Sequence, residues 1–240
     1  MAGVRLALVS DQHGNDIAFR AVVEDIERIG VDRVVCLGDV AQGGAQPAAT
    51  LDRLAELTSE TVLGNADGFL LGDDGSEELT AEHQEVREWA LAQLEERHLE
   101  QLRSFPMTVE LEVDDTKLVL FHASPRSYED VLLPDREDEL DPWLVEADLL
   151  AGGHTHKQWT RRIGSALFVN PGSVGVAYDY HQPEDDFKLD AVAEYALVSI
   201  GPHAPGVEFR RVAYDLDELR EVVLGSGRPY AERHIGMYRT

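Results

Sequence analysis

Polar residues that could bind metal ions follow several apolar runs of this sequence. The run from Val4 to Val9 ends in Ser10-Asp11-Gln12-His13, and the run that closes at Leu37 is followed by Gly38-Asp39. A strand that only fills a core does not need a carboxylate and an imidazole two residues apart at its tip. Five such run ends supply seven candidate metal ligands: Asp11, His13, Asp39, Asn65, His122, His154 and His156.

These seven side chains offer nitrogen and oxygen donors and no thiolate. Such donors suit Mn, Fe, Co, Ni or Zn, and not a cysteine-rich structural zinc site. Seven ligands exceed the need of one tetrahedral ion, whereas two ions that share a carboxylate would use them all, as in phosphoryl-transfer sites. With two carboxylates and a bridging hydroxide counted, such a site keeps about one positive charge. It would attract a phosphate to a chain of formal net charge -25.

The elements that must position these residues alternate between strand and helix in the first part of the chain. Strands are predicted at residues 4–9, 33–37 and 61–63, with helices after Asn15 and at about 47–57. This alternation predicts an α/β fold with a parallel sheet at its centre. Ligands bind at the carboxyl ends of strands in such sheets, which is where the candidate ligands lie.

The remainder of the chain is richer in strands. We expect a Gly- and acid-rich loop at 68–80, a long helix from 80 to about 103, a hairpin around Asp114 and Asp115, and an irregular acidic segment at 125–142. The other expected elements are strands at 147–151, 159–163, 166–169, 194–200 and 207–213, and a helix at 215–224.

Length and composition favour one domain. The chain has 240 residues, 43% of them hydrophobic, which is enough for one sizeable core. We predict a single domain over residues 1–240, with a helical insertion at about 68–105 and a polar tail at about 225–240. No apolar run is long enough for a membrane span, and the acidic charge argues against binding a nucleic-acid duplex. The single cysteine, Cys36, fits a cytoplasmic location. The expected partner is a small phosphate ester, and the oligomeric state is left open.

Five short motifs occur in a fixed order: Asp11-Gln12-His13, Gly38-Asp39, Gly64-Asn65, His122 and Gly153-His154-Thr155-His156. Together they resemble the motifs of the calcineurin-like metallophosphoesterases, closest to a small bacterial and archaeal branch with cyclic phosphodiesterase-like members. The segment Asn-Pro-Gly-Ser-Val at 170–174 also resembles that branch, and the similarity covers roughly residues 4–213. This resemblance implies a four-layer α/β/β/α sandwich of two mixed sheets.

The resemblance also implies an activity and a set of roles. It implies a dinuclear metal-dependent phosphoesterase that hydrolyses a phosphomonoester or phosphodiester through a metal-bridging hydroxide. The implied cofactors are two divalent ions, manganese first, with Fe, Zn, Ni or Co as alternatives, and the implied catalytic residues are Asp39, Asn65 and His122. Carried over position by position, Asp11, His13 and His156 would hold one ion, Asn65, His122 and His154 the other, and Asp39 would bridge both.

One position departs from the family pattern. Many members carry a histidine directly after the Gly-Asn pair, where this chain has Ala66 followed by Asp67. Help from a general acid is typically worth about 10²- to 10⁴-fold, so we expect slower turnover or a preference for better leaving groups. The alternative is a catalytically weak or inactive scaffold for protein assembly. The intact set of seven ligands argues against that alternative.

For several residues outside the motifs, a functional role and a structural role are both open. Asp67 could act in catalysis or support its neighbours, and Arg126 could contact phosphate or lie on the surface. Tyr178 and Tyr180 could line a substrate pocket or pack elsewhere. The remaining histidines are interpreted as ordinary side chains: His83, His98, His181, His203 and His234.

Overall fold

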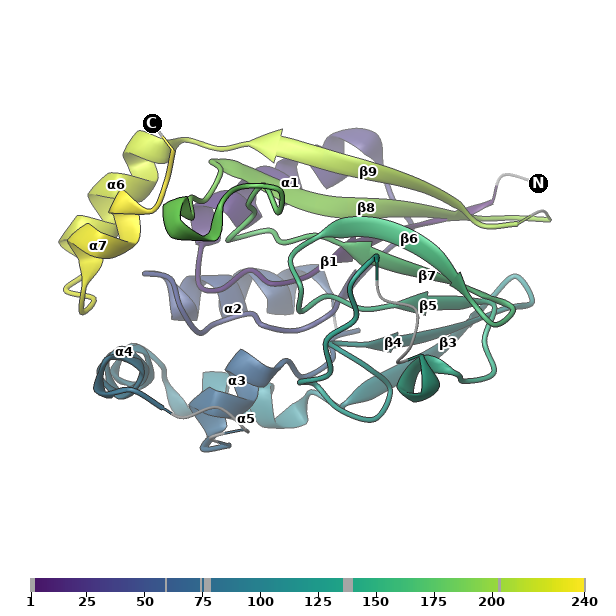
Figure 1. Ribbon diagram of the computed structural model, residues 1–240, viewed down its shortest axis with the longest axis horizontal. Coiled ribbons are helices and arrows are strands. Elements are labelled where there is room, and N and C mark those ends of the chain that lie inside the picture. The colour runs from purple at the N-terminus through teal and green to yellow at the C-terminus, as the bar shows by residue number, and fades with distance from the viewer. Residues whose placement is uncertain are drawn as a thin grey trace.

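Two mixed β-sheets lie against each other, and helices cover one side and gather at one end of the molecule (Figure 1). The computed structural model describes residues 3–58, 60–73, 75, 79–135, 140–202 and 204–239. The strands are β1 (Val4–Val9), β2 (Arg33–Cys36), β3 (Thr108–Val113), β4 (Thr116–Phe121), β5 (Leu149–Ala151), β6 (Gln158–Ile163), β7 (Ala166–Pro171), β8 (Val192–Ile200) and β9 (Gly206–Ala213). The helices are α1 (Asp16–Ile29), α2 (Pro47–Leu57), α3 (Asn65–Leu71), α4 (Ala81–Ala92), α5 (Glu96–Ser104), α6 (Leu216–Gly225) and α7 (Ala231–Gly236), with 3-10 turns at Asp141–Trp143 and Glu184–Asp186.

The strand order determines where the polar motifs meet. One sheet has the order β2-β1-β8-β9 and the other the order β3-β4-β5-β7-β6. β1 pairs with β2 in parallel, and in the second sheet β5 runs parallel to both β4 and β7. The motif residues follow the carboxyl ends of β1, β2, β4 and β5, so both sheets contribute them to one edge, where α/β folds bind ligands.

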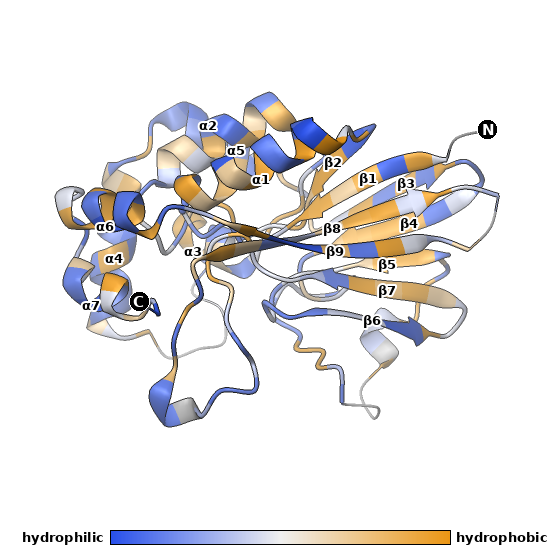
Figure 2. Ribbon diagram, turned by 90° about the horizontal axis from the view of Figure 1, so that it is seen from above, coloured by the Kyte–Doolittle hydropathy of each residue, from blue (hydrophilic) through white to orange (hydrophobic). Residues whose placement is uncertain are grey.

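The central strand β1 is buried on both faces. Leu6 and Leu8 belong to the apolar layer between the two sheets, whereas Ala7 and Val9 belong to the layer beneath the helices. Alternate residues of a strand point to opposite faces, and here both faces are covered, so the strand is an unbroken apolar run. Figure 2 shows the same pattern across the sheets, with apolar residues concentrated in the strands.

Helix α1 follows the first motif directly. The side chain of Asn15 caps it by accepting a hydrogen bond from the Ala18 amide (3.1 Å), and the helix ends at Gly30. Its apolar residues, such as Phe19 and Val22, are fully buried against the sheet. Because the helix is anchored at both its cap and its apolar face, the Asp11–His13 loop before it has a defined position.

A different kind of layer covers the outer face of the second sheet. Trp143, in a 3-10 turn, donates its indole N–H to the carbonyl of Ala123 (2.8 Å) and packs with Phe168 and Leu132. Among the described residues this layer consists of that turn and irregular chain. The α/β fold class with two mixed sheets is confirmed.

Four local predictions were wrong in detail. The expected strand at 61–63 is a single β-bridge between Thr61 and Cys36, and the expected loop at 68–80 begins inside α3. The long helix expected from residue 80 is two helices, because the chain restarts at Glu95, whose amide donates to His98 Nδ1 (3.0 Å) in a capping box. The tail predicted as polar contains the helix α7, and two of its side chains, Ile235 and Tyr238, are buried. The single-domain organisation stays a prediction, and no described helix could span a membrane.

Candidate metal centre

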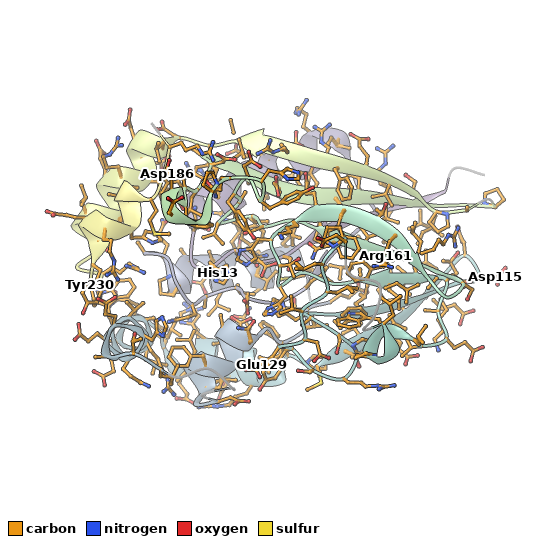
Figure 3. The ribbon with its side chains drawn as sticks, in the orientation of Figure 1. His13, Asp115, Glu129, Arg161, Asp186 and Tyr230 are labelled. Atoms are coloured by element: carbon orange, nitrogen blue, oxygen red, sulfur yellow. The ribbon has the colours of Figure 1, made fainter. Side chains whose placement is uncertain are left out.

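The structure brings the seven predicted ligands together at the shared edge of the two sheets. The first group contains Asp11, His13 and His156. The Nε2 atom of His156 lies 3.2 Å from both Asp11 Oδ1 and His13 Nε2. Figure 3 shows His13 well inside the outline of the molecule, away from both ends of its long axis. This group offers one carboxylate and two imidazoles to a single point.

The second group is centred on an amide oxygen. Asn65 Oδ1 lies 3.0 Å from both His122 Nε2 and His154 Nδ1. Asp39 Oδ2 lies 3.3 Å from His122 Nε2 and 3.6 Å from His13 Nε2, so this carboxylate faces both groups. A shared ligand of two ions must occupy such a position.

Asp11 Oδ1 is a fully buried acceptor whose nearest imidazole nitrogen, His156 Nε2 at 3.2 Å, does not lie in hydrogen-bond geometry. No other group in the described part of the chain donates a hydrogen bond to it. Buried polar atoms are normally satisfied, so an orphan of this kind calls for an explanation. The imidazole nitrogens and carboxylate oxygens around it are atoms that readily coordinate divalent cations. The residues present therefore fit a metal site.

Two backbone carbonyls set the orientation of the imidazoles. His122 Nδ1 lies 2.6 Å from the Leu37 carbonyl, and His13 Nδ1 lies 2.9 Å from the Gln42 carbonyl. A carbonyl can only accept, so Nδ1 carries the proton in both rings and Nε2 is left to bind a metal. The chain thus fixes the tautomer of both histidines before any ion arrives.

Burial and the charges of neighbouring groups shift the pKa values of the candidate ligands. Burial opposes the charge of Asp39, but the facing His122 and His13 hold the pKa of this carboxyl well below its usual range. Burial also opposes the charge of His122, yet Asp39 and Asp11 raise its pKa to about 9. Burial and the nearby His122 lower the pKa of His154 to about 4. The pKa shifts of Asp39 and His122 therefore favour a buried ion pair between these two side chains.

The loops that carry the ligands have strained backbones. Non-glycine residues rarely adopt a positive φ, and holding one there costs about 1–3 kcal/mol, which folded proteins concentrate at functional sites. Five of the seven ligand candidates do so: Asp11 (57°), His13 (48°), Asp39 (57°), His154 (66°) and His156 (55°).

Glycines in the motifs make room for the carboxylates. A Cβ at Gly64 would lie 2.0 Å from Asp39 Oδ1, and a Cβ at Gly153 would lie 2.6 Å from Asp11 Oδ2. Either contact is far inside van der Waals distance. The backbone can therefore approach each carboxylate only because these positions lack a side chain.

Neighbouring residues hold the ligand loops in place. Ser173 donates its hydroxyl to the Asp11 carbonyl (2.8 Å), and Asn170 donates Nδ2 to the Gly153 carbonyl (2.6 Å). Asp67 accepts the backbone N–H groups of Val40 and Ala41. Burial, then the charge of Asp39, raises the pKa of Asp67 to about 7. Of the two interpretations left open for Asp67, this geometry favours support of the loop after Asp39.

A cavity of about 430 Å³ reaches the centre at Asn65 and His154. Its walls come from α3, α4 and the chain around α7, which Figures 1 and 2 place at the same end of the molecule. The sequence does not predict that the C-terminal segment contributes to this cavity, because a polar composition gives no signal for where a segment docks. Ala66 lines the cavity where many relatives of the predicted family carry a histidine.

Comparisons with known proteins agree with this geometry. The sequence profile of the calcineurin-like phosphoesterase superfamily domain matches residues 4–189. An uncharacterized protein of Methanocaldococcus jannaschii is 27% identical over 241 residues, with 93% of each chain covered. A metallophosphoesterase from Sphaerobacter thermophilus is 25% identical, with a TM-score of 0.76 and 98% of both chains covered.

A hypothetical protein from Pyrococcus horikoshii, 19% identical, shares the fold with a TM-score of 0.81 and 98% of both chains covered. The profile match extends over most of the chain and includes every candidate ligand. The same ligands converge in the structure on one edge of two mixed sheets. The chain therefore belongs to the calcineurin-like phosphoesterase superfamily.

Proposed function

We propose that this protein is a dinuclear, metal-dependent hydrolase of phosphomonoesters or phosphodiesters. The observation that carries the proposal is the position of Asp39, whose Oδ2 faces His122 at 3.3 Å and His13 at 3.6 Å. One ion would be held by Asp11, His13 and His156 and the other by Asn65, His122 and His154, with Asp39 shared. Manganese is the first candidate, and Fe, Zn, Ni and Co are alternatives that the same donors accept.

Bound divalent ions would supply Lewis-acid stabilisation of a phosphoryl group and lower the pKa of a bound water. The protein's own part is to fix the ligands. His122 and His13 present Nε2 because backbone carbonyls engage Nδ1, and Asp39 is held by the Ala66 amide, which donates to its Oδ1 at 2.8 Å. Ligands held this rigidly need little reorganisation during the reaction.

The alanine at position 66 sets an expectation about substrates. Its side chain cannot donate a proton, so departure of the leaving group depends on its own stability as an anion. We therefore expect higher turnover of aryl esters than of alkyl esters. A scaffold with this fold would show no such ranking, because it would hydrolyse neither.

The test compares two identical chemical changes at different places. Asp39→Asn removes the shared carboxylate, whereas Asp115→Asn changes an exposed residue in the β3–β4 turn, at the far end of the molecule in Figure 3. Hydrolysis of p-nitrophenyl phosphate and bis-p-nitrophenyl phosphate is measured with manganese, and metal content is determined for each protein. The two esters also separate a phosphomonoesterase from a phosphodiesterase.

We expect Asp39→Asn to lose at least about 100-fold in kcat, the scale on which removal of one preorganised electrostatic group acts. Asp115→Asn should match the wild type. Activity that survives Asp39→Asn would exclude the shared-carboxylate mechanism. Wild-type protein that binds metal and hydrolyses neither ester would favour the scaffold.

A further inference from the structure

One arginine in the cavity beside the metal centre is half-buried and pairs with no carboxylate of the described residues. Arg228 donates Nε to the Gly43 carbonyl and Nη1 to the Pro229 carbonyl, both at 2.7 Å. Both partners are neutral, so they position the guanidinium without cancelling its charge. Other arginines of this acidic chain pair with carboxylates instead, among them Arg53 with Asp16 and Arg210 with Asp25.

The pKa shifts of the arginines show the same contrast. Hydrogen bonds donated to carboxylates raise the pKa of Arg20, Arg53, Arg210 and Arg233. The pKa of Arg228 is lowered instead, by burial and then by the charge of Arg233. An arginine remains charged at neutral pH even so. The molecule thus holds a partly desolvated positive charge that a ligand could neutralise.

The place of Arg228 connects this charge to the metal centre. The Gly43 that it binds lies against His13, because a Cβ at Gly43 would be 3.5 Å from His13 Nδ1. Arg228 lines the same cavity as Asn65 and His154. A molecule whose phosphate reached the metal ligands could therefore present a second group to Arg228.

The other side chains that line the cavity indicate the size and polarity of the ligand's organic part. Two of its acidic side chains are already engaged, since Asp73 accepts the Tyr128 hydroxyl and Glu82 pairs with Arg233. The volume of about 430 Å³ lies in the range of small organic ligands. The apolar and aromatic side chains of the lining include Phe69, Leu79, Val86, Tyr128, Val131 and Met237.

We propose that the substrate is a phosphate ester whose organic part is apolar or aromatic and bears a second anionic group, which Arg228 binds. This inference rests on the proposed phosphoesterase function and names the substrate class of that site. A carboxylate or a second phosphate would serve, since both accept paired hydrogen bonds from a guanidinium. Arg228 lies beyond the family match at residues 4–189, so the family match does not by itself imply a second anionic group on the substrate.

The test uses phosphonates, whose C–P bond is not an ester and is not hydrolysed. (4-Carboxyphenyl)phosphonate is compared with its neutral carboxamide, and 3-phosphonopropionate with its carboxamide, so that each pair differs only in the second charge at one of two spacings. Benzene-1,4-bisphosphonate replaces the carboxylate by a phosphonate. Binding to the manganese-loaded full chain is measured by calorimetry, which needs no turnover.

We expect at least one carboxylate probe to bind about tenfold or more tighter than its amide, as a charge-assisted hydrogen bond would give. Tighter binding of the bisphosphonate than of either carboxylate would identify a phosphate as the second group. Arg228→Gln should abolish the preference and Arg228→Lys should keep part of it. Arg162→Gln is the matched control, because exposed Arg162 also donates to a backbone carbonyl, that of Ser165, outside the cavity, and should change nothing.

Equal binding of acid and amide in both pairs by the wild type would overturn the inference, whatever the variants do. An equal loss for all probes in Arg228→Gln would also overturn it, since that result places Arg228 on the first phosphate. Either result leaves the phosphoesterase proposal standing. Absence of ester hydrolysis, with the acid preference intact, would instead overturn the proposed function and with it the assignment of a substrate, and would leave Arg228 as a group that binds an anionic ligand.

Discussion

The affinity of the centre for metal should depend steeply on pH between 7 and 9, because of one histidine. Burial by itself would lower the pKa of His122, but the charge of Asp39, its hydrogen bond and the charge of Asp11 raise it to about 9. The Nδ1 proton is held by the Leu37 carbonyl, so the proton that a metal must displace sits on Nε2. Metal and proton therefore compete for one atom.

The size of the effect follows from that pKa. At pH 7, about two units below it, roughly one molecule in a hundred has a neutral His122, which weakens binding by about 2.7 kcal/mol at 1.36 kcal/mol per unit. Rising pH removes the competing proton, so the affinity should increase about tenfold per unit from pH 7 to 9 and then level off. Burial lowers the pKa values of His13 and His154, so both are already neutral and add no slope.

The assay is calorimetric titration of metal-free protein with Mn²⁺ at pH 7, 8 and 9, under argon because manganese oxidises in alkaline solution. Repeating each titration in buffers of different ionisation enthalpy counts the protons released. Asp39→Asn removes the charge that raises the pKa of His122, so its weaker binding should be nearly independent of pH in this range. An affinity of the wild type that stays flat from pH 7 to 9 would refute the ion pair between His122 and Asp39.

Three further changes test other parts of the structure. Gly64→Ala places a Cβ 2.0 Å from Asp39 Oδ1, so the carboxylate must move. A displacement of about 1 Å in an active site can cost 100-fold in rate, so kcat should fall while the circular dichroism spectrum stays native. An unchanged kcat would contradict the close packing of Gly64 against Asp39. Tyr195→Phe removes the buried hydroxyl that donates to Asp25 Oδ2 (2.6 Å). The free energy of unfolding, measured by urea denaturation, should fall by about 1–3 kcal/mol. No loss would mean that this hydrogen bond contributes little to stability. Ala66→His introduces the side chain found in many family members. It should raise kcat for phenyl phosphate more than for p-nitrophenyl phosphate, because only the poorer leaving group needs a proton. An equal effect on both esters would exclude a general-acid role for this position.

Much of the fold could be predicted because its central strands are buried on both faces. An unbroken apolar run such as Val4 to Val9 is recognisable without any knowledge of its neighbours. The break between α4 and α5 was not recognisable, since it depends on His98 accepting the Glu95 amide. Helical periodicity continues through that break, so sequence pattern alone favours one long helix.

The candidate ligands could be predicted because they follow short apolar runs, and four of them adjoin a glycine: His13, Asp39, Asn65 and His154. Gly64 and Gly153 mark where the backbone must approach a carboxylate, and that requirement is local to the chain. The role of Arg228 is not local. Its carbonyl partner, Gly43, lies 185 residues away, and only the docking of the C-terminal segment brings the two together.

The central claim is that two metal ions share Asp39 between two groups of ligands. Anomalous diffraction from crystals soaked in manganese tests it directly. We expect two anomalous peaks about 3.5–4 Å apart, one beside His13 and His156 and the other beside His122 and His154, with Asp39 contacting both. A single peak, or peaks that do not contact Asp39, would contradict it.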